Sequence, residues 1–210
     1  MSRSCLLFDL DGTLVDSLPD LATAINLLRA DFGLNPLSIS EVRNFIGDGA
    51  RALVKRSLPE GSFEQSKLQR FLLYYQQHLC ELSTPYPGIP EMLEQLHSLP
   101  LAVVTNKPQQ MAQELLEKLN LDKYFQLVLG GDSCPQKKPH PTPVLTALKK
   151  LKAENRYSLM IGDHHTDLRA AIAADTPACF CSWGYGNDGG ETSAYTANSV
   201  TELRHILTQR

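Results

Sequence analysis

The chain contains short apolar runs without polar alternation, and each run stops at polar or glycine residues. The runs cover residues 5–10, 101–104, 126–129, 158–161 and 178–182. Uninterrupted runs of this length are typical of strands buried on both faces, as in a parallel sheet. Helical patterns lie between the later runs, for example Met111, Leu115, Leu116 and Leu119. Strands that alternate with helices predict a doubly wound, Rossmann-like α/β fold built on a parallel sheet.

One long stretch, between the first run and Leu101, has helical patterns and little strand character. Leu18, Leu21, Ile25 and Leu28 recur every three or four positions, which predicts an amphipathic helix. Further helices are expected after Ser40 as N-cap, over residues 50–58 and over about 63–82. The pattern therefore predicts a small helical cap domain, residues 16–83, inserted into an α/β core of residues 1–15 and 84–210. Residues 184–199, rich in Gly, Asn, Asp and Ser, are expected to form a long surface loop.

Composition and charge exclude several classes of protein. With 42% apolar residues, 20% charged residues and a net charge of −3, the chain can build a core but lacks the basic surface that nucleic acids require. No apolar run approaches the roughly 18 residues of a membrane helix. The scattered cysteines and the lack of a signal-peptide pattern predict reduced thiols in a cytoplasmic protein. We expect no nucleic-acid or membrane partner, and a monomer or homodimer.

Carboxylates follow two of the predicted strands. Asp9 and Asp11 end the first run, and Asp163 and Asp167 follow the run at 158–161. Because ligands of such sheets bind beyond the carboxyl ends of the strands, we expect these side chains to meet. Carboxylates held close together favour a bridging cation, and oxygen ligands suit Mg²⁺. The alternative, that Asp9 only caps a turn, fits poorly with its apolar flank.

Other strand ends offer groups that suit an anion. Thr105 has a hydroxyl at the end of the run 101–104, and Lys138 lies among prolines that fix the local backbone. A lysine there would supply positive charge to a phosphate, although it could also be an ordinary surface residue. His164 and His165 follow Asp163, and adjacent histidines in a turn are expected to face solvent rather than bind zinc.

These positions together resemble the four motifs of the haloacid dehalogenase superfamily, in that family's order. The motifs are Asp9-x-Asp11-Gly12-Thr13, Thr105-Asn106, Lys138-Pro139 and Gly162-Asp163-x-x-x-Asp167. The resemblance spans the whole chain and includes the position of a helical cap after the first motif. The dehalogenases of the superfamily lack the second aspartate, so Asp11 indicates its phosphatase and phosphomutase branch.

The resemblance implies a catalytic role for each motif. Asp9 would be the nucleophile that forms an aspartyl-phosphate, and Asp11 the general acid and then the general base. Mg²⁺ would be held by Asp9, Asp11 (through its backbone carbonyl), Asp163 and Asp167, of which Asp167 would orient ligands or water. The phosphoryl oxygens would be bound by Thr105, Asn106 and Lys138.

The expected substrate is 2-phosphoglycolate. The segment Phe45–Arg51 and the region Gly130–Pro143 resemble phosphoglycolate phosphatases. Gly47 would let the backbone approach a small substrate, and Arg51 would bind its carboxylate, unless Arg43, Arg51 and Lys55 are simply a solvated helix face. Sugar phosphates, nucleotides and N-acetylmuramic acid phosphate are alternative substrates within the branch.

Two other functions remain as alternatives. A phosphomutase would use the same core but keep a bisphosphate intermediate. A phospho-accepting receiver domain also combines acidic residues, Thr and Lys, but it carries the phosphorylated aspartate on a later strand and has no helical insert. Because all four motifs are complete, we expect a Mg²⁺-dependent phosphatase of carbohydrate metabolism.

Overall fold

The computed structural model describes residues 4–209; residues 1–3 and 210, which belong to the predicted core segments, lie outside this description. The strands are β1 (Leu6–Phe8), β2 (Val15–Asp16), β3 (Thr84–Pro85), β4 (Leu101–Val104), β5 (Leu127–Leu129), β6 (Leu159–Gly162), β7 (Ala178–Cys181) and β8 (Tyr195–Ala197). The α-helices are α1 (Leu18–Ala30), α2 (Ile39–Arg43), α3 (Ala50–Arg56), α4 (Gln65–Gln77), α5 (Ile89–Gln95), α6 (Gln109–Lys118), α7 (Thr142–Leu151), α8 (His165–Ala173) and α9 (Val200–Thr208).

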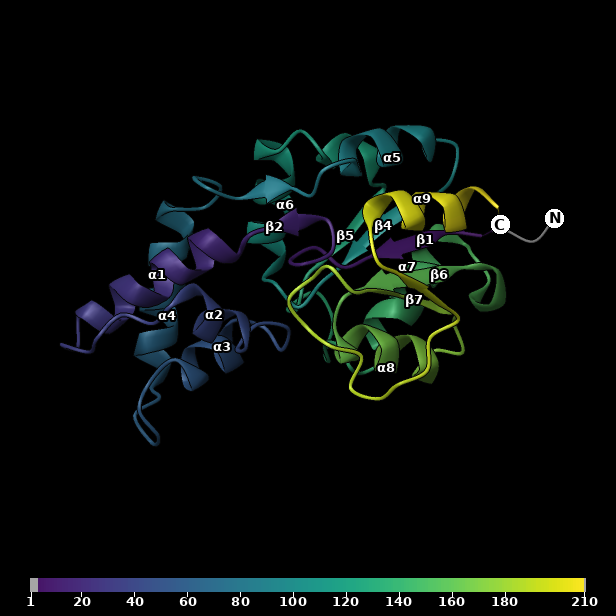
Figure 1. Cartoon of the computed structure of the whole chain (residues 1–210). Helices are drawn as coiled ribbons and strands as arrows, with labels where there is room; N and C mark the ends of the chain where they lie inside the picture. The colour runs from purple at the N-terminus through teal and green to yellow at the C-terminus, as the bar shows by residue number, and fades with distance from the viewer. Residues whose placement is uncertain (1–3, 210) are drawn as a thin grey trace.

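A parallel sheet lies at the centre of the molecule, with the strand order β5-β4-β1-β6-β7-β8 (Figure 1). β1 pairs with both β4 and β6, so that Leu7 lies between Ala102 and Met160. All residues of β1, β4 and β6 are buried, which explains why their sequences do not alternate between apolar and polar positions. The predicted parallel sheet is confirmed, and the five apolar runs are its first five strands in order along the chain.

Helices cover both faces of the sheet. On one face Leu6 and Phe8 pack with apolar residues of α5, α6 and α9, and on the other Leu7 packs with α7 and α8. Burying one such side chain contributes about 1.5–3 kcal/mol, so each helix is held mainly by its apolar face. This two-sided arrangement confirms the doubly wound α/β fold.

The edge strand β8 was not predicted. It lies within residues 184–199, which we expected to be a loop, and pairs in parallel with β7 so that Cys179 opposes Tyr195. Two of its three residues are exposed, and a short, half-exposed edge strand leaves little apolar signal in the sequence. The helix α9, which follows directly and packs on the sheet through Leu203, was also missed.

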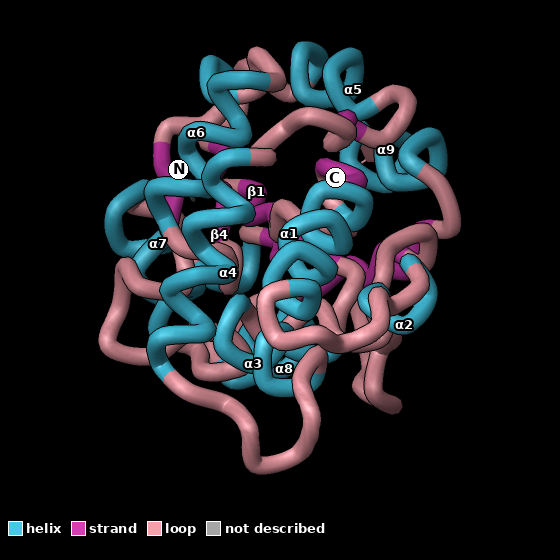
Figure 2. Tube along the Cα trace, turned by 90° about the vertical axis from the view of Figure 1, so that its left-hand side faces the viewer, coloured by secondary structure: helices cyan, strands magenta, loops and turns pink. Residues whose placement is uncertain are grey.

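Helices α1–α4 form a separate helical group beside the sheet (Figures 1 and 2). Within it α1 packs on α4 and α2, and α3 packs on α4. α2 begins after Ser38, not after Ser40 as predicted, because Ser38 and Glu41 form a reciprocal capping box. The helix expected over about 63–82 is shorter, Gln65–Gln77.

The helical group is joined to the sheet by two adjacent segments. β2 and β3 pair antiparallel, with Asp16 opposite Thr84. The buried Asp20 carboxylate accepts hydrogen bonds from the backbone N–H groups of Leu82 and Ser83, both at 2.9 Å. The chain therefore leaves and re-enters the sheet region at one place, although the division into core and cap domains stays a prediction.

All five cysteines are free thiols. Among residues 4–209, no helix has both the length and the apolar character needed to cross a bilayer.

Candidate active site

Three predicted site residues lie at the same edge of the sheet, each directly after a central strand. Asp9 follows β1, Thr105 follows β4 and Asp163 follows β6. The backbone N–H of Asp9 donates to the carbonyl of Ile161 at 2.8 Å, so the β1–β6 pairing extends to this edge of the sheet. The parallel register therefore brings motifs together that are far apart in the sequence, as predicted.

The carboxylate of Asp9 has one oxygen held and one oxygen free. Oδ1 accepts a hydrogen bond from the backbone N–H of Leu10 at 2.8 Å and lies 3.0 Å from the ammonium of Lys138. Oδ2 makes no hydrogen bond with the part of the chain that the structure describes. Because the held oxygen fixes the plane of the carboxylate, the free oxygen has a defined direction.

Lys138 is a buried cation at the centre of the site. Its Nζ donates to the carbonyl of Val104 and to Oδ1 of Asp167, both at 2.6 Å, in addition to its contact with Asp9. Burial alone would lower the pKa of Lys138, but the charges of Asp167 and Asp9 outweigh burial and raise this pKa. The ammonium therefore stays charged, and Lys138 is not the ordinary surface residue of the alternative interpretation.

Three buried carboxylates form a candidate metal site. One oxygen each of Asp9, Asp163 and Asp167 lies within 4.8 Å of the other two. Burial, and then repulsion from Asp167, raises the pKa of Asp9 to about 6. Burial, and then the charges of Asp9 and Asp167, raises the pKa of Asp163 to about 7. A single lysine does not compensate this cluster, so an all-oxygen site with excess negative charge fits Mg²⁺.

The orientation of Asp163 is fixed by two loops. The hydroxyl of Thr13 donates to its Oδ1 at 2.8 Å, and the backbone N–H groups of Tyr185 and Gly186 donate to Oδ2 at 2.8 and 3.2 Å. A Cβ atom on Gly184 would lie 2.2 Å from the Cβ of Asp163. The contribution of residues 184–186 was not predicted, although the closely spaced glycines after β7 were a signal that the backbone approaches another group there.

Asp167 lies behind the other two carboxylates. It is fully buried, its Oδ1 accepts from Lys138, and its Oδ2 accepts from the backbone N–H of His164 at 3.1 Å. These contacts leave Asp167 to orient Lys138 and the start of α8, which is compatible with its expected orienting role.

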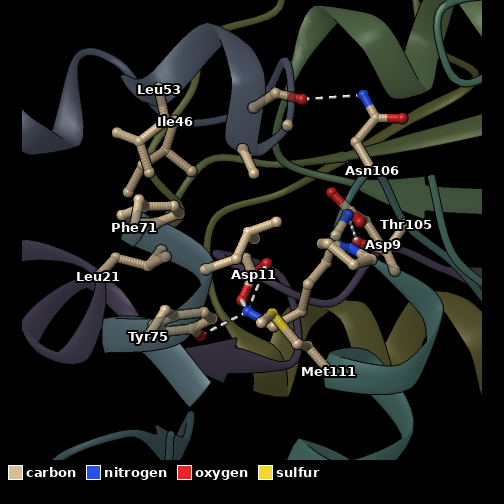
Figure 3. A pocket seen from close by; sticks show the side chains of 16 residues that line it. Asp9, Asp11, Leu21, Ile46, Leu53, Phe71, Tyr75, Thr105, Asn106 and Met111 are labelled. Atoms are coloured by element: carbon tan, nitrogen blue, oxygen red, sulfur yellow. Dashed lines mark hydrogen bonds and ion pairs between the residues drawn. The ribbon is translucent and has the colours of Figure 1, made fainter. Parts of the chain in front are cut away.

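Asp11 is paired with a lysine that the sequence analysis did not single out. Lys107 Nζ lies 2.9 and 3.2 Å from the two Asp11 oxygens, and it donates to the hydroxyl of Tyr75 in α4 at 2.5 Å (Figure 3). The hydroxyl of Ser17 also donates to Asp11, at 2.5 Å. Lys107 is 5% exposed, so a charged residue that resembles a surface lysine in the sequence lies inside the site.

A pocket opens between the sheet edge and the helical group (Figure 3). Asp9, Asp11, Thr105, Asn106 and Lys107 line its polar side. Its other side is apolar, lined by Leu21, Ile46, Leu53, Phe71 and Leu72. The pocket therefore places polar and charged groups at one end and an apolar surface at the other.

Asn106 and Gly47 connect the two sides of the pocket. The Asn106 side-chain amide donates to the carbonyls of Gly47 and Lys138, both at 3.0 Å, while its Oδ1 is buried and accepts no hydrogen bond from residues 4–209. Gly47 has φ +116°, a value that favours glycine. Asn106 thus ties the loop between α2 and α3 to the core.

The structure does not bring Arg51 to the pocket. Its guanidinium donates to Gln65 Oε1 at 2.9 Å, lies 4.6 Å from the centre of the Phe63 ring, and is exposed. The pocket lining does not include Arg51. Arg51 sits on the solvated face of α3, which was the alternative interpretation of this residue.

The expectation that both adjacent histidines face solvent is wrong for His164. Its ring is 8% exposed, caps α8 through the backbone N–H of Thr166, and lies under Gly47 and Gly186. Burial, and then the neighbouring His165, lowers the pKa of His164 to about 4. His165 is half-buried. The packing of the α2–α3 loop onto α8 buries His164, and no local pattern indicates that contact.

Known proteins resemble this chain over nearly its whole length. The family model for haloacid dehalogenase-like hydrolases matches residues 6–181. A phosphoglycolate phosphatase of Chromobacterium violaceum is 37% identical over 209 residues, covering 95% of this chain and 94% of the relative. A phosphoglycolate phosphatase of Aquifex aeolicus is also 37% identical, over 96% of this chain and 95% of the relative.

A solved structure shows the same fold. The crystal structure of a predicted phosphoglycolate phosphatase from Haemophilus somnus superimposes with a TM-score of 0.90 and 32% identity, covering 100% of this chain and 98% of that chain. The family indicated by the four motifs is thereby confirmed. The chain belongs to the haloacid dehalogenase-like hydrolases, in their phosphoglycolate phosphatase-like branch, and is a phosphoric monoester hydrolase.

Proposed function

We propose that the chain hydrolyses 2-phosphoglycolate to glycolate and phosphate, with Mg²⁺ and through an aspartyl-phosphate on Asp9. The observation that supports this most is the meeting of three carboxylates and Lys138 at one sheet edge. The substrate is suggested by relatives named phosphoglycolate phosphatase.

Asp9 is the proposed nucleophile. Its free Oδ2 attacks phosphorus, an Asp9 O–P bond forms, and the bond from phosphorus to the leaving oxygen breaks. Leu10 and Lys138 hold Oδ1, so that the attacking oxygen is already oriented before substrate binds.

Asp11 is the proposed acid and base. It gives a proton to the leaving alkoxide, then takes one from the water that attacks phosphorus; this second attack breaks the Asp9 O–P bond and releases phosphate. Lys107 and Ser17 hold the Asp11 carboxyl in the pocket, and its contact with Lys107 has to loosen when it carries a proton.

Mg²⁺ fits the carboxylate cluster, with Asp9, Asp163 and the backbone carbonyl of Asp11 as ligands and Asp167 as an orienting residue. When bound, it supplies positive charge to the phosphoryl oxygens. The chain offers further groups to the phosphoryl oxygens: the hydroxyl of Thr105, the ammonium of Lys138 and two backbone N–H groups. These two, the N–H groups of Asp11 and Asn106, donate no hydrogen bond within residues 4–209. A unit of positive charge attracts a charged phosphoryl oxygen by roughly 4 kcal/mol at a distance of 4 Å and an effective dielectric of ~20.

Lys107 is the proposed partner of the substrate carboxylate. Among the residues that line the described pocket it is the positively charged one, whereas Arg51 points to Gln65 and Phe63. A substrate carboxylate beside Lys107 would replace Asp11 as its ion-pair partner and release Asp11 for proton transfer.

A second candidate substrate has a leaving group larger than glycolate, such as a sugar phosphate, a nucleotide or N-acetylmuramic acid phosphate. The apolar side of the pocket favours this candidate, because glycolate would leave residues such as Leu53 and Phe71 without contact. A phosphomutase of the same superfamily is a further alternative.

Phosphate release from a panel of small phosphomonoesters tests the proposal. With Mg²⁺, we expect 2-phosphoglycolate to have the highest kcat/KM of the panel, and chelation of the metal to stop release. A higher kcat/KM for a sugar phosphate or nucleotide would contradict the proposed substrate, while the proposed chemistry would still hold. Turnover without release of inorganic phosphate would indicate a phosphomutase instead.

We also propose where in the cell this activity takes place. The five free thiols support a reducing compartment such as the cytoplasm. We place the reaction in carbohydrate metabolism, in a monomer or homodimer.

A further inference from the structure

A second group of potential metal ligands lies outside the carboxylate cluster. It consists of Asp48, His164 and His165, and one ligand atom of each lies within 4.8 Å of the other two. Asp48 belongs to the loop between α2 and α3, whereas the histidines stand at the start of α8. The group therefore joins the helical segment to the sheet region.

His164 is a buried residue and contributes a ring nitrogen to this group. Its Nδ1 is paired with the Thr166 hydroxyl at 3.0 Å, while its Nε2 makes no hydrogen bond within residues 4–209. A Cβ atom on Gly47 would lie 2.5 Å from Nε2 and 2.6 and 2.7 Å from the two adjacent ring carbons, so Gly47, in the loop that carries Asp48, packs over this part of the ring. When Nε2 binds an ion, Nδ1 carries the ring proton and donates it to the Thr166 hydroxyl, which fixes the ring.

The other two residues also have free ligand atoms. Asp48 Oδ2 is paired with Arg56 at 2.5 Å, which leaves Oδ1 without a hydrogen bond in the described chain. The half-buried His165 ring lies 3.9 Å from the His164 ring, between centres, and its nitrogens make no hydrogen bond to residues 4–209. One carboxylate and two imidazoles can thus turn toward a common point.

We propose that Asp48, His164 and His165 form a second cation site, for a borderline transition-metal ion such as Zn²⁺. Imidazole nitrogen favours Zn²⁺, Co²⁺ and Ni²⁺, whereas the all-oxygen cluster of Asp9, Asp163 and Asp167 suits Mg²⁺. Three protein ligands leave one tetrahedral position for water. An ion bound here ties the α2–α3 loop, and with it Gly47, to α8.

Calorimetric titration of the full chain with Zn²⁺ tests the site. Saturating Mg²⁺ is present throughout, so that the carboxylate cluster is already filled. We expect one equivalent of Zn²⁺ to bind the wild type, and Asp48→Asn and His165→Asn to weaken its affinity at least about tenfold. His97→Asn is the matched control, because His97 is an exposed histidine in another part of the chain; its affinity should equal that of the wild type.

Two further measurements separate this site from the carboxylate cluster and from a folding defect. Asp163→Asn should keep its Zn²⁺ affinity, and Co²⁺ should give a visible absorption band that disappears in His165→Asn. His165 is chosen over His164 because His164 also caps α8, and circular dichroism checks that each variant is folded. Hydrogen exchange of residues 44–49 should slow with Zn²⁺ in the wild type and not in His165→Asn.

Three results would overturn the proposal. The first is a wild type that binds no Zn²⁺ in saturating Mg²⁺, and the second is unchanged affinity in both Asp48→Asn and His165→Asn. The third is loss of Zn²⁺ binding in Asp163→Asn but not in His165→Asn, which would place the ion in the carboxylate cluster. None of these readouts depends on the proposed phosphatase activity.

Discussion

Asp9 and Asp11 stand two positions apart in the sequence but meet different cations. Asp9 shares Lys138 with Asp167, whereas Asp11 pairs with Lys107. Burying a carboxylate is costly unless a positive group compensates it. The two lysines therefore give two similar side chains separate environments, which fits a nucleophile and an acid.

Lys138 has the largest expected effect on stability of any single residue at this site. Replacing it by methionine leaves Asp9, Asp163 and Asp167 buried without their cation, and we expect the free energy of unfolding without metal to fall by about 3–5 kcal/mol. Urea unfolding in a chelator measures this. The control is Lys137→Met, since the ammonium of the half-buried Lys137 donates to a backbone carbonyl, that of Asp48, and not to a buried carboxylate. An equal loss in both variants would contradict the central role of Lys138.

Lys107 is expected to select substrates with a carboxylate. In Lys107→Met, the kcat/KM for 2-phosphoglycolate should fall at least about tenfold more than that for phenyl phosphate, because a charge-assisted hydrogen bond contributes about 1.5–3 kcal/mol. The two kcat/KM values are compared as a ratio, because loss of the contact between Lys107 and Asp11 affects the hydrolysis of both substrates. Arg51→Gln is the control and should leave the ratio unchanged; a ratio that changes only in Arg51→Gln would restore the sequence-based prediction.

Sequence patterns identified residues that stand in motifs and missed those that are defined by packing. Asp9, Thr105, Lys138 and Asp163 end buried strands or follow fixed turns, so topology alone brings them together. Lys107 follows the second motif and looks like any lysine near a helix start; its contacts with Asp11 and with Tyr75 of α4 show its position in the structure. His164 was misjudged for the same reason, because a distant loop covers it.

At the scale of elements, the segment after β7 positions side chains of the site, as the central strands do. Tyr185 and Gly186 hold Asp163, while the Tyr185 hydroxyl donates to Asp16 in β2 at 2.7 Å. This segment thus connects a proposed metal ligand to the linker between sheet and helical group.

Gly184→Ala tests that connection. Its Cβ would lie 2.2 Å from the Cβ of Asp163, so Asp163 or the loop must move, and we expect Mg²⁺ affinity to fall about tenfold or more. Gly190→Ala is the control for backbone strain without a clash, because Gly190 has φ +77° and nothing lies within 4 Å of its added Cβ. Calorimetric Mg²⁺ titration of both variants measures the difference, and equal affinities would show that the loop does not position Asp163.

The strands that are buried on both faces were predictable from the sequence, whereas the edge strand β8 was not. β1, β4 and β6 consist of buried residues only, and such continuous apolar runs are unusual outside a parallel sheet. β8 has two exposed residues among three and follows a glycine-rich loop. Its pairing depends on β7 being in place, which is tertiary information that a local pattern does not contain.

At the scale of the whole molecule, the pocket lies between two bodies of structure. α1, α3, α4 and the α2–α3 loop contribute its apolar side, and the sheet edge contributes its charged side. Entry of substrate therefore depends on the position of the helical group relative to the sheet. An ion that links the α2–α3 loop to α8 would restrain that position.

The stability of the whole chain should depend on pH and Mg²⁺ together. The folded pKa values of Asp9 and Asp163, about 6 and about 7, lie above the value of about 3.9 for an unfolded chain. The folded state then binds more protons, so metal-free stability falls as pH rises from about 4 to 7. Because Mg²⁺ binds the deprotonated carboxylates, its stabilising effect should grow over this range.

Thermal unfolding with and without Mg²⁺ measures this effect. Well above pH 7, Mg²⁺ at 100 times its Kd should add about 2.7 kcal/mol, which corresponds to a Tm increase of about 5–10 °C. At pH 5 the increase should be much smaller. A Tm increase that is the same at pH 5 and pH 8 would contradict the coupling of proton and metal at these carboxylates.

The most direct test of the account is phosphate release from 2-phosphoglycolate by the wild type and by Asp9→Asn, each with saturating Mg²⁺. We expect Mg²⁺-dependent release by the wild type and a loss of at least about 10³-fold in Asp9→Asn, because the amide cannot form the phosphoryl-enzyme bond. Acid-quenched wild type should carry a phosphoryl group on the peptide that contains Asp9. Wild-type release by a correctly folded Asp9→Asn would contradict the account.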